Sequence, residues 1–88
     1  MRTPVYTKQF ERDLKRCLKR GVEVEKLKAV IAKLCNEGKL DFKYRDHKLK
    51  GKYEGRRECH IEPDWLLVYK AAGDEVLFER TGTHSDLF

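Results

Sequence analysis

Histidine, aspartate and arginine side chains in the second half of the chain are the residues most able to do chemistry. His60 and Asp64 lie on either side of a predicted turn, and Arg80 and His84 lie at the end of a later predicted strand. Imidazoles titrate near neutral pH and can therefore accept or release a proton. RNA cleavage needs a base for the ribose 2′-hydroxyl, an acid for the departing 5′-oxygen and a cation beside the phosphorus. The set contains these parts and requires neither a metal nor a cofactor.

Each of these residues also has an ordinary structural explanation. His60 alone is more often an exposed strand histidine, and Asp64, which follows a proline, is a common turn former. Arg80 can form a surface ion pair worth about 0 to 1 kcal/mol, and His84 can lie in a solvated tail. Trp65 fits a hydrophobic core better than a platform for a base. The functional interpretation depends on the joint occurrence of these residue types.

Two helices are predicted in the first half of the chain. Apolar residues recur with helical spacing through residues 7 to 20, where Thr7 can cap the start and Gly21 can end the helix. The same pattern runs through residues 24 to 34 and ends before Gly38. The short link around Gly21 predicts that the two helices are antiparallel neighbours.

Strands are predicted in the second half, where the apolar period changes to two. Residues 57 to 62 alternate, residues 65 to 69 are apolar on both faces as in a central strand, and residues 75 to 81 form the last strand. Gly73 and Asp74 predict a tight hairpin turn, and residues 4 to 6 can pair at an edge. We therefore expect an α+β fold, in which two antiparallel helices pack on one face of a small twisted antiparallel sheet.

The alternating strand at residues 57 to 62 predicts which side chains are buried. Cys59 and Ile61 point to the core in this interpretation, and Glu58, His60 and Glu62 point to solvent. A meander of the later strands then brings His60 near the residues at the end of the last strand, at one end of the sheet.

Length and composition limit the class of protein. The chain has 88 residues, room for one domain spanning 1 to 88, and its 20 Lys and Arg against 15 Asp and Glu give a net charge of +5. No apolar run approaches the roughly 20 residues that cross a bilayer, and the amino terminus lacks the apolar core of a secretion signal. We expect a cytoplasmic protein whose cysteines are reduced, with Cys17 and Cys35 packed as small hydrophobic residues.

Positive charge is concentrated in residues 43 to 57, KYRDHKLKGKYEGRR, which carry a net charge of +5 with tyrosines interleaved. Such a segment suits phosphate backbones, because each neutralised phosphate releases counterions. A solvated loop that keeps a small protein soluble explains the charge equally well.

Three stretches resemble a known family: DHKLKG at 46 to 51, RECHIEPDWLLVYK at 57 to 70 and FERTGTHSDLF at 78 to 88. They resemble the YafQ family of ribosome-dependent mRNA-cleaving toxins, within the RelE/ParE superfamily of type II toxin-antitoxin systems. The resemblance implies a RelE-like fold and an mRNA interferase, an endoribonuclease that enters the ribosomal A site, cuts the messenger and inhibits translation.

The resemblance also assigns functional positions. His84 and Asp64 become the candidates for proton transfer, and Arg80 the stabiliser of the phosphate. His47 and His60 become phosphate-binding or acid-base helpers, without a decision on which imidazole is the base. The carboxy-terminal Phe88 can stack on a base or close the pocket. The implied catalytic set is His47, His60, Asp64, Arg80, His84 and Phe88.

Binding residues and partners follow from the same resemblance. We expect contacts with messenger RNA and 16S ribosomal RNA at Lys48, Lys50, Lys52, Tyr53, Arg56 and Arg57, with Trp65 in a supporting position. A cognate antitoxin protein is expected to mask the toxin, and operator DNA is expected to be bound only by the toxin-antitoxin complex.

Two alternatives remain open at this point. A toxin of the same fold but of the ParE kind binds gyrase without cutting RNA, and it has no use for three histidines. A small zinc protein can use His47, His60, His84 and Asp64 as ligands, although the gaps between the histidines match no common zinc spacing.

Overall fold

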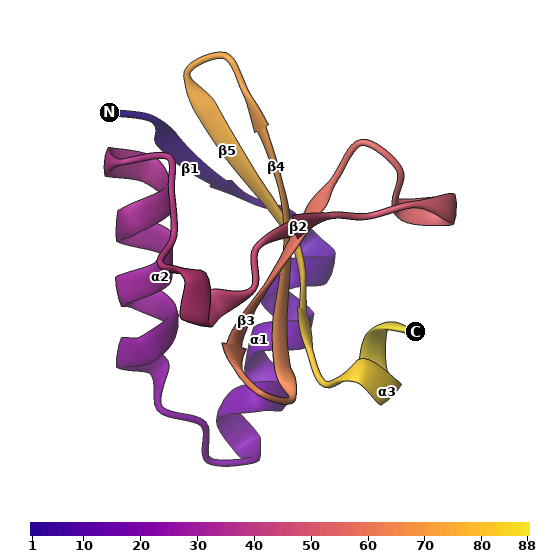
Figure 1. Ribbon diagram of the computed structural model, residues 1–88. Helices are drawn as coiled ribbons and strands as arrows, with labels where there is room; N and C mark the ends of the chain where they lie inside the picture. Colours follow the sequence, from indigo (N-terminus) through magenta and orange to yellow (C-terminus); the bar gives the residue numbers. More distant parts are fainter.

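Five strands form one sheet in the order β1-β5-β4-β3-β2 in the computed structural model, which describes residues 1–88 (Figure 1). The chain forms two helices after its first strand and a third short helix at its end. The elements are β1 (Thr3–Tyr6), α1 (Lys8–Lys19), α2 (Val24–Asn36), η1 (Phe42–Tyr44), β2 (His47–Lys48), η2 (Gly51–Tyr53), β3 (Arg57–Glu62), β4 (Trp65–Ala72), β5 (Glu75–Gly82) and α3 (His84–Leu87).

The two long helices begin and end where the sequence predicts. The hydroxyl of Thr7 caps α1 by accepting from the backbone N–H of Phe10 at 2.9 Å. Gly21 has a φ of +87°, which other residues adopt only with strain, and this lets the chain leave α1 and turn back. α2 ends at Asn36, just before Gly38. No helix combines the length and apolar character needed to cross a membrane.

The predicted meander is confirmed, because β2, β3, β4 and β5 pair antiparallel in sequence order. The edge strand β1 differs, since it pairs parallel to β5 with Tyr6 opposite Phe78. Its direction is explained by the next element: Thr7 both caps α1 and donates its hydroxyl to the carbonyl oxygen of Glu79 at 3.0 Å. β1 therefore runs parallel to β5, so that Thr7 lies at the end of the sheet where α1 begins.

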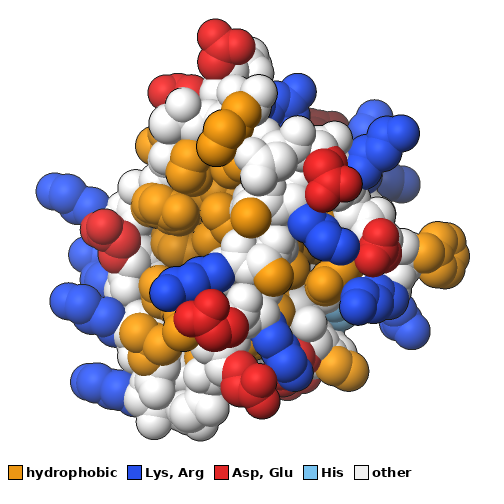
Figure 2. All heavy atoms as spheres, turned by 90° about the vertical axis from the view of Figure 1, so that its left-hand side faces the viewer, with side chains coloured by type: hydrophobic (Ala, Val, Ile, Leu, Met, Phe, Trp, Pro, Cys, Tyr) orange, Lys and Arg blue, Asp and Glu red, His pale blue; other side chains and the backbone are white.

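The core lies between the helices and one face of the sheet, as expected. Cys17 and Cys35 are buried in it as small hydrophobic side chains, and both thiols are free. On the α2 side, Figure 2 shows apolar side chains gathered between Lys, Arg, Asp and Glu side chains, so this face carries mixed charge. The core residues include Phe10, Leu27, Val30, Leu34, Cys59, Ile61, Leu67, Tyr69, Val76 and Phe78.

The opposite face of the sheet is partly covered as well. Leu66 and Val68 of β4 are fully buried there against Leu87 of α3. The prediction of a solvated face on β3 is therefore wrong at Glu58, which is 5% exposed. Periodicity predicts that a side chain points away from the helices, but the residues that pack over that face, among them Leu49, Tyr53 and Leu87, decide how much of it water reaches.

Candidate active site

Strand pairing places the polar residues of three strands on the face opposite α1 and α2. Directly paired residues of neighbouring strands point to the same face of a sheet, so a chain of pairs forms a row across it. One such row consists of His47, Glu58, Val68 and Arg80. The next row along the same face contains His60, which pairs with Leu66.

The three imidazole rings lie together at this end of the sheet. The ring centroids of His47 and His60 are 6.3 Å apart, and those of His60 and His84 are 5.6 Å apart. The structure therefore brings together side chains from β2, β3 and α3. His60 therefore lies close to both of the other imidazoles.

Asp64 orients His84. Oδ1 of Asp64 lies 2.6 Å from Nδ1 of His84 and accepts the backbone N–H of the same residue at 2.9 Å. These bonds, the backbone one first, lower the pKa of the Asp64 carboxyl from its ordinary value. An ionised carboxylate only accepts, so Nδ1 of His84 carries a hydrogen and Nε2 is left free to exchange a proton.

His47 is held at both ring nitrogens. Nδ1 lies 2.7 Å from the carbonyl oxygen of Arg45, and Nε2 lies 3.0 Å from Oε2 of Glu58. Arg45 has a φ of +50°, in the left-handed region that non-glycine residues rarely adopt, and this turn presents its carbonyl to the ring. The backbone conformation before β2 thus fixes the orientation of the imidazole.

His60 repeats this arrangement. Its Nδ1 lies 3.3 Å from the carbonyl oxygen of Pro63 in the turn after β3, and its Nε2 lies 3.9 Å from Oε2 of Glu58. A carbonyl oxygen accepts only, so Nδ1 is again the nitrogen that carries a hydrogen. In all three histidines a local acceptor occupies Nδ1, and Nε2 faces Glu58 in His47 and His60 and has no partner in His84.

Glu58 is a site residue that the sequence interpretation missed. Its carboxylate lies between the Nε2 atoms of His47 and His60, and its other oxygen, Oε1, is buried without a hydrogen-bond partner. An acidic residue on the predicted solvent side of a strand gives no signal of burial. The strand register, which pairs Glu58 with His47, is the observation that reveals it.

Arg80 is presented by a buried carboxylate on α1. Its Nε and Nη2 donate to Asp13 at 2.7 and 3.2 Å, and its Nη1 lies 3.4 Å from the hydroxyl of Tyr53. The ordinary alternative for Arg80, a surface ion pair, is therefore not what forms, because its partner is a buried carboxylate. Asp13 was also missed, because nothing in the sequence links residues so far apart.

Nearly the whole chain matches one family of known proteins. Residues 2–88 match a family model described as a bacterial toxin of type II toxin-antitoxin systems, YafQ. The chain belongs to the YafQ toxin family. The resemblance seen in three stretches of sequence thus extends over both halves.

Relatives and solved structures agree with this membership. The mRNA interferase toxin YafQ of Escherichia coli K12 is 43% identical over 84 residues, covering 94% of this chain and 91% of the relative. A crystal structure of YafQ from E. coli BL21(DE3) has a TM-score of 0.93 at 40% identity, covering 100% of this chain and 99% of that one. YafQ in the E. coli DinJ-YafQ complex has a TM-score of 0.91 at 42% identity, with coverage of 100% and 99%.

Phe88 of this YafQ-family toxin lies beside the site. Its ring is 61% exposed and meets the ring of Tyr53 edge-on, with the centroids 5.5 Å apart. Lys52 places its ammonium 5.3 Å from the centre of the Tyr53 ring. The neighbouring Leu87 is buried and anchors α3, so the exposed ring of Phe88 has a fixed support.

The predicted RNA-binding residues fall into two groups. Lys48, Lys50 and Lys52 are exposed on the segment that runs from β2 into η2. Arg56 and Arg57 are half-buried and donate to Glu79 at 2.6 Å and to Asp46 at 3.1 Å. In this YafQ-family chain the three lysines are thus more accessible to a phosphate than the two arginines.

Trp65 lies in the core and is 3% exposed. Its Nε1 donates to the hydroxyl of Thr81 at 2.9 Å, which joins the start of β4 to the end of β5. The ring supports the site from within the YafQ fold and offers no exposed face to a nucleotide base.

The zinc alternative receives no ligand set from the geometry. No three side chains among His, Cys, Asp and Glu converge closely enough to hold a metal ion. The hypothesis stays open to metal analysis of the purified toxin.

Proposed function

We propose that this toxin is a ribosome-dependent endoribonuclease that cuts messenger RNA in the A site by metal-independent general acid-base catalysis. The observation that carries the proposal is the cluster of three imidazoles, each tied at Nδ1 by a local acceptor, on the sheet face that also carries Arg80. The name of the E. coli relative, mRNA interferase toxin, supports the same reaction.

The chemical step uses one base and one acid. A neutral imidazole removes the proton of the ribose 2′-hydroxyl, and the 2′-oxygen attacks the adjacent phosphorus. The bond from phosphorus to the 5′-oxygen breaks as an imidazolium returns a proton to that oxygen, leaving a cyclic phosphate and a 5′-hydroxyl. Each proton transfer typically contributes about 10² to 10⁴-fold to the rate.

Individual roles follow from the contacts. His84, oriented by Asp64, exchanges a proton through its free Nε2. The guanidinium of Arg80 stabilises the charge that develops on the phosphate oxygens. His47 and His60 act as the second proton-transfer group and as phosphate ligands.

The ribosome supplies the docking surface in this proposal. The exposed lysines at 48, 50 and 52 contact phosphates of 16S ribosomal RNA, and the ring of Phe88 stacks on a messenger base. Such contacts place the messenger against the histidines. The toxin acts in the cytoplasm, where ribosomes translate.

A cognate antitoxin controls the toxin in the cell. The structure of the E. coli relative in complex with DinJ shows that a protein of this family binds an antitoxin. We infer that an antitoxin of matching chemistry masks this toxin and that the pair binds operator DNA through the antitoxin.

Mapping messenger 5′ ends in cells after brief induction tests the proposal. We expect new 5′ ends within translated codons for the wild type and none for His84→Ala, a change of an exposed side chain that leaves the fold intact. Growth arrest with DNA-damage signalling and no new RNA ends would instead favour the gyrase-binding alternative.

A further inference from the structure

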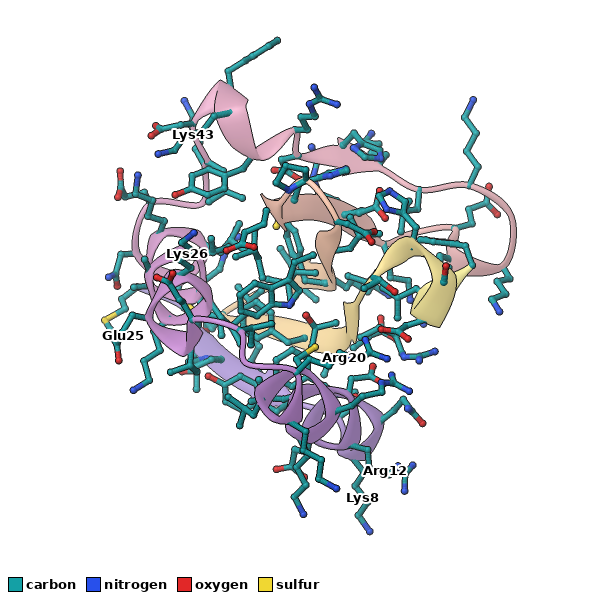
Figure 3. All side chains as sticks on the ribbon, turned by 90° about the horizontal axis from the view of Figure 1, so that it is seen from below. Lys8, Arg12, Arg20, Glu25, Lys26 and Lys43 are labelled. Atoms are coloured by element: carbon teal, nitrogen blue, oxygen red, sulfur yellow. The ribbon has the colours of Figure 1, made fainter.

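The inner side of α1 carries a carboxylate that is completely buried. Asp13 has no exposed surface, whereas Lys8 and Arg12 of the same helix point away from the sheet (Figure 3). A buried carboxylate is costly to the fold unless donors surround it. The groups that contact Asp13 therefore indicate its role.

Asp13 is surrounded by donors from two elements. Oδ2 accepts from Nε of Arg80 at 2.7 Å and from the backbone N–H of Thr81 at 3.2 Å. Oδ1 accepts from Nη2 of Arg80 at 3.2 Å, from Gln9 at 3.0 Å and from Arg16 at 2.7 Å. Burial alone raises the pKa of Asp13, but these hydrogen bonds outweigh it and hold the pKa below its ordinary value.

The position of Asp13 follows from the sheet. β1 pairs with β5 only as far as Phe78, so the end of β5 has no neighbouring strand on that side. α1 packs there instead, and Asp13 accepts the N–H of Thr81 that a strand partner would otherwise take. One carboxylate thus completes the edge of the sheet and binds the arginine next to it.

Two hydrogen bonds to one carboxylate fix the plane of a guanidinium. Because Nε and Nη2 of Arg80 are both held by Asp13, only the edge that carries Nη1 is left for a ligand. Nη1 lies 3.4 Å from the hydroxyl of Tyr53, whose ring meets Phe88. The free edge of the guanidinium therefore faces the side of the sheet where the site lies.

We propose that Asp13 is the positioning residue of Arg80, holding its guanidinium so that Nη1 donates to the phosphate that is cleaved. This inference rests on the proposed function, because it assigns Arg80 to the messenger phosphate. It differs from a purely structural ion pair, in which the contacts of Arg80 stabilise the fold and contribute nothing to cleavage.

Chemical rescue tests the inference directly. Arg80→Ala removes the cation, and removing one positioned donor costs about 10² to 10³-fold in rate. Because Asp13 remains in that variant, free guanidinium ion at non-denaturing concentration can occupy the vacated position. We expect guanidinium chloride to restore ribosome-bound messenger cleavage by at least about tenfold, and sodium chloride at equal ionic strength to restore none.

The double variant Asp13→Asn/Arg80→Ala lacks the carboxylate and should show no rescue. Equal rescue of the single and double variants, or no rescue of Arg80→Ala, would overturn the inference. Failure of the wild type to cleave under the same conditions would overturn the proposed function instead. Circular dichroism of every variant at the guanidinium concentration used keeps loss of fold apart from loss of activity.

A second measurement covers the case in which Arg80→Ala does not fold. Asp13→Asn should lower kcat by about 10 to 100-fold with little change in KM, since the lost interaction is made in the transition state. In an Arg80→Lys background, where an ammonium cannot use the same two-pronged contact, Asp13→Asn should cost less than about twofold. Equal losses in both backgrounds contradict a role through Arg80.

Glu11→Gln is the matched control. It removes the same charge from the same helix, but Glu11 is exposed and contacts no site residue. Cleavage by this variant should equal that of the wild type. A loss comparable to that of Asp13→Asn would show that cleavage depends on the charge of α1 and not on the hydrogen bonds between Asp13 and Arg80.

Discussion

Nε2 of His47 lies 3.0 Å from Oε2 of Glu58, while Nδ1 of the same ring faces the carbonyl oxygen of Arg45 at 2.7 Å. Both ring nitrogens thus face acceptors, and a proton must lie between the imidazole and the carboxylate. His60 approaches the same carboxylate oxygen at 3.9 Å. The buried carboxylate of Glu58 is therefore the one negative group that lies against both imidazoles.

Replacing Glu58 with glutamine tests this role. The amide keeps the shape but places no negative charge beside the two imidazoles, so we expect single-turnover cleavage to fall by about 10 to 100-fold and its pH dependence between about pH 5 and 8 to change. The free energy of unfolding should stay the same or rise, because the buried Oε1 of Glu58 has no partner in the wild type. Rates across pH and urea unfolding provide the two measurements.

The matched control for this prediction is Glu62→Gln. Glu62 lies on the same strand, but its carboxylate pairs with Lys26 on α2 and forms no ion pair with a histidine. An unchanged rate and pH profile for Glu58→Gln, equal to those of the control, would leave Glu58 with no part in the chemistry.

Asp64 should titrate below the ordinary carboxyl range. Its hydrogen bonds from His84 lower the pKa, so the carboxylate and its bonds to His84 persist until the pH falls through that lowered value. We expect carbon NMR of the Asp64 carboxyl to give a midpoint below about 3.9, the usual value for aspartate. In His84→Ala the backbone bond remains and the side-chain bond is lost, so the midpoint should move part of the way back.

Cleavage should respond to Asp64 in the same graded manner. Asp64→Ala removes the acceptor that fixes the ring of His84, whereas Asp64→Asn keeps an oxygen that accepts. The alanine variant should therefore lose more activity than the asparagine variant. Equal activity of both variants to the wild type would separate Asp64 from the reaction.

Asp86 connects α3 to α1 and should make the toxin sensitive to acid. It accepts from Arg20 at 2.6 and 3.1 Å and from the backbone of Thr83 at 2.9 Å, and these bonds lower its pKa strongly. Since the folded-state pKa is depressed, its contribution is present above the unfolded-state value and is lost as the pH falls through the folded-state value. Asp86→Asn should lower the free energy of unfolding at neutral pH by about 1 to 2 kcal/mol.

Urea unfolding at neutral and at acid pH measures this effect. The difference between the wild type and Asp86→Asn should shrink below about pH 4, where the wild-type carboxyl begins to lose its advantage. Asp74→Asn in the exposed β4–β5 hairpin is the control and should change little at either pH. A difference that stays constant from neutral to acid pH contradicts the assignment.

The exposed lysines should determine how ribosome binding depends on salt. Lys50→Gln and Lys52→Gln should each weaken binding and reduce the slope of log affinity against log salt by about one unit per lost phosphate contact. Arg56→Gln should reduce the slope less, because its guanidinium is paired with Glu79. Binding titrations over a range of salt concentrations supply the slopes. Unchanged slopes for the lysine variants would assign these charges to solubility or to the antitoxin.

Sequence alone determined the features that depend on neighbouring residues. The cap at Thr7 and the glycine after α1 predicted the first helix, and the change of period to two predicted β3, β4 and β5. The stretches around His47, His60 and His84 identified the family, which the comparisons confirm. These signals are local because helix capping, turn geometry and side-chain alternation act over a few residues.

Only the tertiary structure decided which charges are buried and what they hold. Glu58 was expected in water, but it is buried, and the pairing of β2 with β3 places its carboxylate beside His47 as well as His60. Asp13 meets Arg80 across 67 residues of sequence, because α1 takes the place of a strand beside β5. Burial and ion pairing depend on which element packs on which face, and the periodicity of a single element does not show which other element covers it.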